Sequence, residues 1–115
     1  LTCCVNIHKC KGEDKGIQPP GDVIAAEGDT VTLGCTFESS YTTAQLNVLW
    51  YKQEVNGFPK YILLRRGSYG DNAPEFQKDR FDAKLNTTSV PLKIQKLQLS
   101  DSAVYYCADT WDYHL

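Results

Sequence analysis

Two widely separated cysteines with a tryptophan between them constrain the fold of this chain more than any other feature. Cys35 is followed by Trp50, and Cys107 closes the run Asp101-Ser102-Ala103-Val104-Tyr105-Tyr106-Cys107. We expect Cys35 and Cys107 to form a disulfide that joins two sheets and is covered by the indole of Trp50. Tyr105 stands two residues before the second cysteine, where its hydroxyl can bond the backbone of the preceding corner.

The segments that carry these residues alternate in the manner of half-buried β-strands. Residues 30–37, 46–53 and 103–108 place both cysteines, the tryptophan and Tyr105 on buried faces. Residues 81–85 and 90–97 form a predicted hairpin, and turns recur along the whole chain. Because no stretch has a sustained helical period, the sequence predicts an all-β sandwich of two antiparallel sheets.

Composition limits the class of protein. The 115 residues suffice for one domain with a hydrophobic core, since 42% are hydrophobic and 23% are charged. The formal net charge is −2 without a basic block, so nothing indicates a nucleic-acid partner or an anionic membrane surface. No apolar run approaches the roughly 18 residues of a spanning helix. No signal-peptide pattern is present, and we expect the chain to be a fragment.

Five cysteines in a short chain favour an oxidising compartment. Three of them crowd the start of the sequence: Cys3, Cys4 and Cys10. With His8 they offer donors for zinc, but adjacent cysteines and the absence of C-x2-C spacing argue against such a site. We expect residues 1–15 to be an irregular extension outside the domain and residues 16–115 to form the domain.

The strands on either side of the predicted turn at Asn56-Gly57 have an unusually apolar and aromatic outward face. Together with the last strand they present Tyr51, Gln53, Pro59, Tyr61, Leu63 and Tyr106. A monomer rarely exposes such a contiguous surface, so we expect a partner to cover it. Coverage by the chain's own terminal segments is the alternative. The consecutive apolar residues 61–64 also imply a strand that is buried on both faces.

Three polar loops are expected to meet at one end of the sandwich. Their candidate contact residues are Ser39, Ser40, Tyr41, Thr42, Thr43, Gln45, Arg66, Ser68, Tyr69, Asp109, Thr110 and Trp111. Rigid aromatic side chains among small polar ones make an adaptable contact surface, although ordinary solvated loops have a similar composition.

Other motifs add one modification site and no chemistry. Asn86-Thr87-Thr88 is an N-glycosylation sequence at a predicted hairpin tip. The histidines lie in the terminal segments, and the chain contains neither a nucleophile elbow nor a phosphate-binding glycine loop. We therefore expect no enzymatic activity, no cofactor and no metal.

Four runs of the sequence resemble an immunoglobulin variable domain and are most similar to T-cell receptor alpha or delta variable domains. They are Trp50-Tyr51-Lys52-Gln53, Phe58-Pro59-Lys60-Tyr61-Ile62-Leu63, Arg80-Phe81-Asp82-Ala83-Lys84-Leu85 and residues 92–108. The resemblance covers residues 17–109 and implies a variable-type Greek-key sandwich. It also implies that Arg80 meets Asp101 at the base, with Trp50 and Tyr105 as core markers.

The resemblance implies partners and a location. The outward face, with Tyr51, Gln53, Pro59, Tyr61 and Tyr106, would pair with a beta-type variable domain in a heterodimer. The end loops would contact a peptide held by a major histocompatibility complex (MHC) molecule, and signalling would belong to associated membrane chains. The domain would lie on the extracellular face of the plasma membrane. The alternative is a variable-type domain of an innate immune receptor or a cell-adhesion protein.

The resemblance also predicts an incomplete last strand. A complete variable domain ends with a strand that carries a Phe-Gly-x-Gly bulge, whereas only residues 108–115 follow the last cysteine here. An unrearranged gene segment would have this form.

Overall fold

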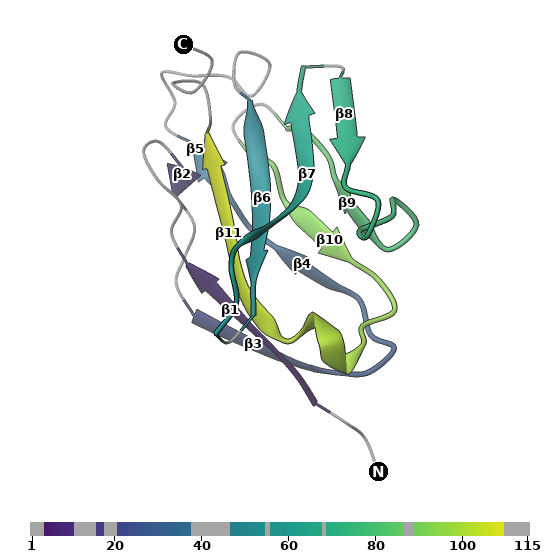
Figure 1. Cartoon of the computed structure of the whole chain (residues 1–115). Coiled ribbons are helices and arrows are strands. Elements are labelled where there is room, and N and C mark those ends of the chain that lie inside the picture. Colours follow the sequence, from purple (N-terminus) through teal and green to yellow (C-terminus); the bar gives the residue numbers. More distant parts are fainter. Residues whose placement is uncertain are drawn as a thin grey trace.

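The computed structural model describes residues 4–10, 16–17, 21–37, 47–54, 56–67, 69–86 and 89–109. These residues form two main sheets that face each other across a hydrophobic core (Figure 1). Apart from the short 3-10 helix Leu99–Asp101, the regular elements of this described part are all strands. The predicted all-β sandwich is therefore confirmed.

The larger sheet contains most of the strands. Within the described residues its order is β3 (Gly21–Ala26), β1 (Cys4–Cys10), β11 (Ala103–Asp109), β6 (Val48–Gln53), β7 (Lys60–Arg66) and β8 (Tyr69–Asn72). Every neighbouring pair is antiparallel except β1 and β11, which run parallel. The sheet is therefore antiparallel, as the sequence predicted, apart from the one parallel pair that β1 forms with β11.

The second sheet is smaller and antiparallel. Its described strands are β4 (Val31–Leu33), β10 (Leu92–Ile94) and β9 (Phe81–Ala83), in that order. Two short strands, β2 (Gly16–Ile17) and β5 (Thr36–Phe37), pair separately. The antiparallel pairing of β9 with β10 places the predicted hairpin of residues 81–97 in this sheet.

The N-terminal segment differs from the prediction of an irregular extension. β1 lies between β3 and β11 (Figure 1), with Ile7 opposite Val23 on one side and Ala103 on the other. Ile7 is fully buried and belongs to the core cluster. The alternation of Val5 and Ile7 with polar residues is too short to identify a strand. The pairing depends on backbone partners that are distant in sequence.

The predicted disulfide joins the two sheets through the centre of the core. Cys35 follows β4 and bonds Cys107 of β11 across 72 positions of sequence. Closing a loop of this length stabilises the fold by about 4 kcal/mol in the chain-entropy model. The fully buried Trp50 lies beside it in register with Cys107 and donates its indole N–H to the carbonyl of Val90 at 3.0 Å.

A bulge in β7 explains the row of apolar residues without requiring burial on both faces. The register between β6 and β7 shifts after Trp50, which pairs with Leu63, so that Tyr51 pairs with Tyr61. The bulge places Ile62 and Leu63 together in the core, whereas Tyr61 is only half-buried. The placement of Leu63 on the outward face was therefore wrong, because strict alternation does not hold across a bulge.

The packing of β1 can be tested by truncating Ile7. We expect Ile7→Ala to lower the free energy of unfolding by about 2 to 5 kcal/mol, because it removes a buried side chain and leaves a cavity. Ile24→Ala on the adjacent β3 removes a side chain that is 67% exposed. That control should change stability by less than about 1 kcal/mol. Urea denaturation measures both, and equally small effects would contradict the packing of β1 on the core.

Candidate functional site

A polar corner at the start of β11 closes the base of the sandwich. The carboxylate of the buried Asp101 accepts hydrogen bonds from the guanidinium of Arg80 and from the backbone N–H of Gln98, the latter at 2.8 Å. The backbone carbonyl of Asp101 accepts a bond from the hydroxyl of Tyr105 at 2.7 Å. The structure thus brings together Arg80, Asp101 and Tyr105 in the arrangement that the resemblance implied.

Tyr105 is fixed in its neutral form by this environment. Burial raises the pKa of its phenol well above the ordinary value of 10.0, and the nearby Asp101 carboxylate raises this pKa further. The positive charge of Arg80 acts in the opposite direction and is the smaller effect. The hydroxyl therefore stays a donor to the Asp101 carbonyl through the physiological pH range.

The outward face of the larger sheet carries a row of tyrosines on three adjacent strands. Tyr106 of β11 is in register with Tyr51 of β6, which is in register with Tyr61 of β7. All three are half-buried, and the hydroxyl of Tyr61 donates to the carbonyl of Asp71 at 3.2 Å. Burial is the largest effect raising the pKa of Tyr61. This row is the centre of the predicted chain-pairing face.

Gln53 lies beside this row and is held in a fixed orientation. Its side-chain oxygen accepts a bond from the hydroxyl of Tyr106 at 3.1 Å, and its side-chain nitrogen donates to the carbonyl of Gly57 at 3.2 Å. A primary amide has two N–H groups and two acceptor positions on its oxygen. These two bonds thus leave one donor and one acceptor of Gln53 for a further partner. The nearby turn exposes Pro59 and the ring of Phe58, which is 89% exposed.

The described strand ends next to the predicted loops lie at the same end of the larger sheet. One row of the register joins the last residue of β11, Asp109, to Val48, then to Arg65 and finally to Gly70. The turn between β7 and β8 lies just beyond this row, with Arg66 and Tyr69 paired and exposed. Nine candidate contact residues lie outside the described residues: Ser39, Ser40, Tyr41, Thr42, Thr43, Gln45, Ser68, Thr110 and Trp111.

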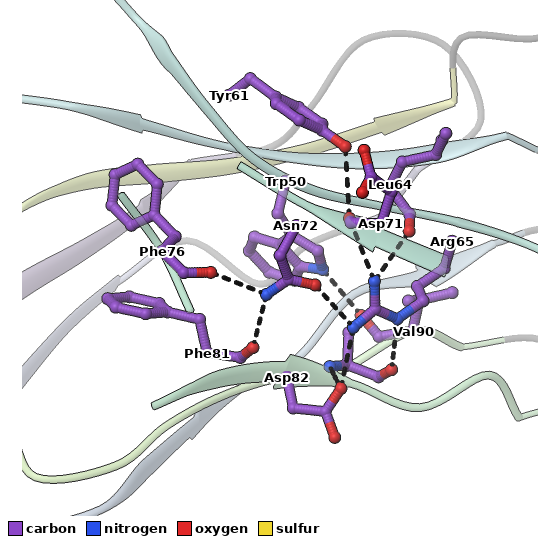
Figure 2. A network of polar contacts seen from close by, with 11 residues as sticks. Trp50, Tyr61, Leu64, Arg65, Asp71, Asn72, Phe76, Phe81, Asp82 and Val90 are labelled. Atoms are coloured by element: carbon purple, nitrogen blue, oxygen red, sulfur yellow. Dashed lines mark hydrogen bonds and ion pairs between the residues drawn. The ribbon is translucent and has the colours of Figure 1, made fainter. Parts of the chain in front are cut away.

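Two buried cations were not identified from the sequence. Lys52 follows Val48 and Trp50 on the inward side of β6, where its ammonium donates to the carbonyl of Ser100 at 2.6 Å. It also lies 3.5 Å from a carboxylate oxygen of Glu54. Arg65 is buried at the opposite end of the sheet, at the centre of the polar network in Figure 2. For Lys52 the inward position in the strand alternation was the available signal, because a charged residue there must find partners. For Arg65 the alternation gave no such signal, because the bulge in β7 changes the face on which this residue lies.

The other sites considered from the sequence are the cysteines at its start and the glycosylation sequence. The structure describes no side chain for the proposed zinc donors Cys3, Cys4, His8 and Cys10. Among the described residues, no group of histidine, cysteine and carboxylate side chains could hold a metal ion. Asn86 of the glycosylation sequence is exposed. The described part of the chain contains no helix of the length and apolarity needed to span a membrane.

Comparisons with known proteins agree with this geometry. Residues 18–114 match the family model of the immunoglobulin V-set domain. A T-cell receptor alpha chain V region from Mus musculus is 41% identical over 98 residues, covering 83% of this chain and 68% of the relative. T cell receptor alpha variable 18 from Homo sapiens is 36% identical over 95 residues, covering 83% of this chain and 80% of the relative. Immunoglobulin superfamily member 11 from Bos taurus is 35% identical over 94 residues, which are 22% of its length.

The state of Tyr105 predicts a pH dependence of stability. Because the pKa of Tyr105 is raised in the folded state, the contribution of its phenol to the free energy of unfolding is constant below about pH 10. Above about pH 10 this tyrosine ionises in the unfolded chain, and the contribution is lost. The loss is up to about 1.4 kcal/mol per pH unit. Tyr105→Phe costs about 1 kcal/mol at pH 7 by removing the hydrogen bond, but abolishes this loss. Urea unfolding from pH 7 to 11.5 should therefore show the difference between the two proteins closing above pH 10.

The exposed Tyr69 provides the control for this measurement. Tyr69→Phe should follow the wild-type curve at all pH values, because no buried hydroxyl is removed. A Tyr105→Phe curve parallel to that of the wild type up to pH 11.5 would contradict a buried, neutral phenol.

Proposed function

Since this chain belongs to the immunoglobulin V-set family and its relatives include T-cell receptor alpha variable regions, we propose that it recognises peptide–MHC as one half of a paired receptor. V-set domains of this kind are receptor-type modules without enzymatic chemistry. The mechanism is contact between surfaces. One face binds a second variable domain, and the loop end of the same sheet contacts the antigen.

The outward face of β11, β6 and β7 is the observation that carries this proposal. It combines a row of half-buried tyrosines with the exposed Pro59 and Phe58, as in interfaces with an aromatic centre. Gln53 supplies the polar contact. Its remaining donor and acceptor suit a reciprocal pair of hydrogen bonds with a primary amide on the partner. The proposed partner is therefore a beta-type variable domain that forms a heterodimer with this chain.

The loop end supports the antigen-binding half of the proposal. The register row from Asp109 to Gly70 shows that β11, β6, β7 and β8 all reach the same end of the sheet. Arg66 and Tyr69 are exposed there. An aromatic ring next to a guanidinium suits a mixed apolar and polar ligand such as a peptide in its presenting groove.

The proposal includes a location and further partners. T-cell receptor variable regions are parts of membrane receptors, so we place this domain on the extracellular face of the plasma membrane. Signalling would then belong to associated membrane chains. An oxidising compartment agrees with the Cys35–Cys107 disulfide.

A second candidate function has one observation in its favour. The similarity to Immunoglobulin superfamily member 11 extends over 78% of this chain. A variable-type domain of an innate receptor or adhesion protein would use the same outward face for a different partner. Association with a beta variable domain supports the first function. Self-association of the chain through this face, without binding the beta domain, supports the second.

We propose that Asn86 carries an N-linked glycan. The side chain of Asn86 is exposed, and its amide nitrogen donates to the hydroxyl of Ser89 at 3.3 Å. Expression in a glycosylating cell should give a protein whose apparent mass falls on treatment with peptide N-glycosidase. Asn86→Gln should show no such shift, whereas a shift that persists in this variant would contradict the assignment.

The pairing face can be tested with a refolded T-cell receptor beta variable domain. Gln53→Leu should raise the dissociation constant about tenfold or more, because it removes the amide that contacts the partner. Lys93→Ala changes an exposed residue of β10 in the other sheet and should leave the constant within about twofold. Sedimentation velocity measures both. If the unmodified chain fails to bind any beta domain of a diverse panel, or if both variants bind equally, the pairing proposal is wrong.

A further inference from the structure

We propose that Arg65 is a positioning residue for the loop end: its buried guanidinium holds β8 against the smaller sheet and thereby fixes the place from which Tyr69 projects. The inference rests on the proposed function only in treating the loop end as a contact surface. The interaction itself can be tested without any ligand.

The guanidinium of Arg65 is fully hydrogen-bonded. Its Nε donates to the carbonyl of Ala83 at 2.9 Å, and Nη1 donates to the carbonyls of Leu64 at 2.8 Å and Asp71 at 3.3 Å. Nη2 donates to the side-chain oxygens of Asn72 at 3.1 Å and Asp82 at 2.8 Å. Arginine has five N–H groups, so each has a partner. Figure 2 shows this side chain between residues of β7, β8 and β9.

These bonds connect the two sheets. Leu64 and Arg65 belong to β7 and Asp71 and Asn72 to β8 in the larger sheet, whereas Asp82 and Ala83 belong to β9 in the smaller one. The bond to Asp82 is also an ion pair, with the Arg65 side chain only 7% exposed. A buried charge without its partners is strongly destabilising, so the guanidinium holds these strands in one arrangement.

Asn72 extends the connection. Its side-chain oxygen accepts the bond from Arg65, and its amide nitrogen donates to the carbonyls of Phe76 at 2.9 Å and Phe81 at 2.8 Å. Both N–H groups of the amide are therefore used. The end of β8 is tied to the start of β9 and to the segment that joins the two strands.

β8 depends on these polar contacts because it has little else to hold it. Its sequence is Tyr-Gly-Asp-Asn, in which Gly, Asp and Asn are poor strand formers. Tyr69, Gly70 and Asp71 are exposed, so this strand buries almost no apolar surface. β8 also forms the described edge of the larger sheet and pairs there with β7 alone.

Gly70 makes room for the hydrogen bonds of the Arg65 guanidinium to β8 and β9, which we call the Arg65 clamp. A Cβ atom at this position would lie 3.1 Å from Cδ, and 3.2 Å from Nε and Nη1, of Arg65. Gly70 is the direct register partner of Arg65 on β8. The absence of a side chain therefore lets the guanidinium cross this strand to reach β9. The next register pair is Arg66 with Tyr69, which is 57% exposed.

The test combines two variants that disturb the clamp from opposite sides. Arg65→Lys keeps the charge but removes the planar set of donors. Gly70→Ala keeps Arg65 but adds the crowding methyl group. We expect hydrogen exchange of the β8 amides to become about tenfold to hundredfold faster in both variants. The same acceleration is expected for the amide of Ala73, which donates to the carbonyl of Ile62 at 2.8 Å. The loss of local stability in the double variant, calculated from the exchange rates, should be smaller than the sum of the two single losses, because both changes disturb one interaction.

The position of Tyr69 is followed in the same proteins by 19F NMR of 3-fluorotyrosine, with its line assigned through Tyr69→Phe. We expect this line to shift and narrow in both variants. Gly34→Ala is the matched control, because a Cβ atom there meets nothing within 4 Å. Val90→Ala changes a fully buried core residue that precedes β10, controls for a general loss of stability and should leave the Tyr69 line in place.

Each outcome decides the proposal. Unchanged β8 exchange and an unchanged Tyr69 line in Gly70→Ala would overturn it, even if Arg65→Lys failed to fold. Equal acceleration of all amides, matching that in Val90→Ala, would also overturn it, since Arg65 would then stabilise the domain without positioning the turn. Association with the beta variable domain should be unchanged in Gly70→Ala. Failure of that association in the unmodified chain would count against the proposed function and not against the clamp.

Discussion

The connection between the two sheets, formed by the Cys35–Cys107 disulfide and the packing of Trp50, is the constraint on which the rest of the structure depends. The Cys35–Cys107 disulfide fixes the distance between them, and Trp50 fills the adjacent space with its only polar group bonded to Val90. The inward faces of both sheets are committed to this core, and the tyrosine row and Gln53 lie on the opposite, outward face of the larger sheet.

Two ion pairs, one at each end of the sandwich, add to this connection between the sheets. At the base, Arg80 before β9 meets Asp101 before β11, and at the loop end Arg65 of β7 meets Asp82 of β9. Both pairs link the smaller sheet to the larger one. Hydrophobic burial in the core is non-directional, whereas each guanidinium forms directional bonds. The ends of the sandwich are thus held in position more specifically than hydrophobic burial alone would allow.

Strand β1 covers the edge of β11 that does not pair with β6. β11 pairs with β6 on one side and with β1 on the other, and β1 runs parallel to it. An unpaired strand edge invites association with another chain, so this pairing protects the backbone of β11. Residues 110–115, on which the prediction of an incomplete last strand depends, lie outside the described residues.

The sequence by itself determined the sandwich, the disulfide, the role of Trp50 and the outward tyrosines, because each depends on residue type and on a period of two along one strand. Only the tertiary structure decided where β1 pairs, how the β7 bulge turns Leu63 inward, and what surrounds Arg65 and Lys52. These features depend on partners that are distant in sequence. A buried cation in a strand shows that partners must exist, but only the packing of two sheets shows which carbonyls and carboxylates they are.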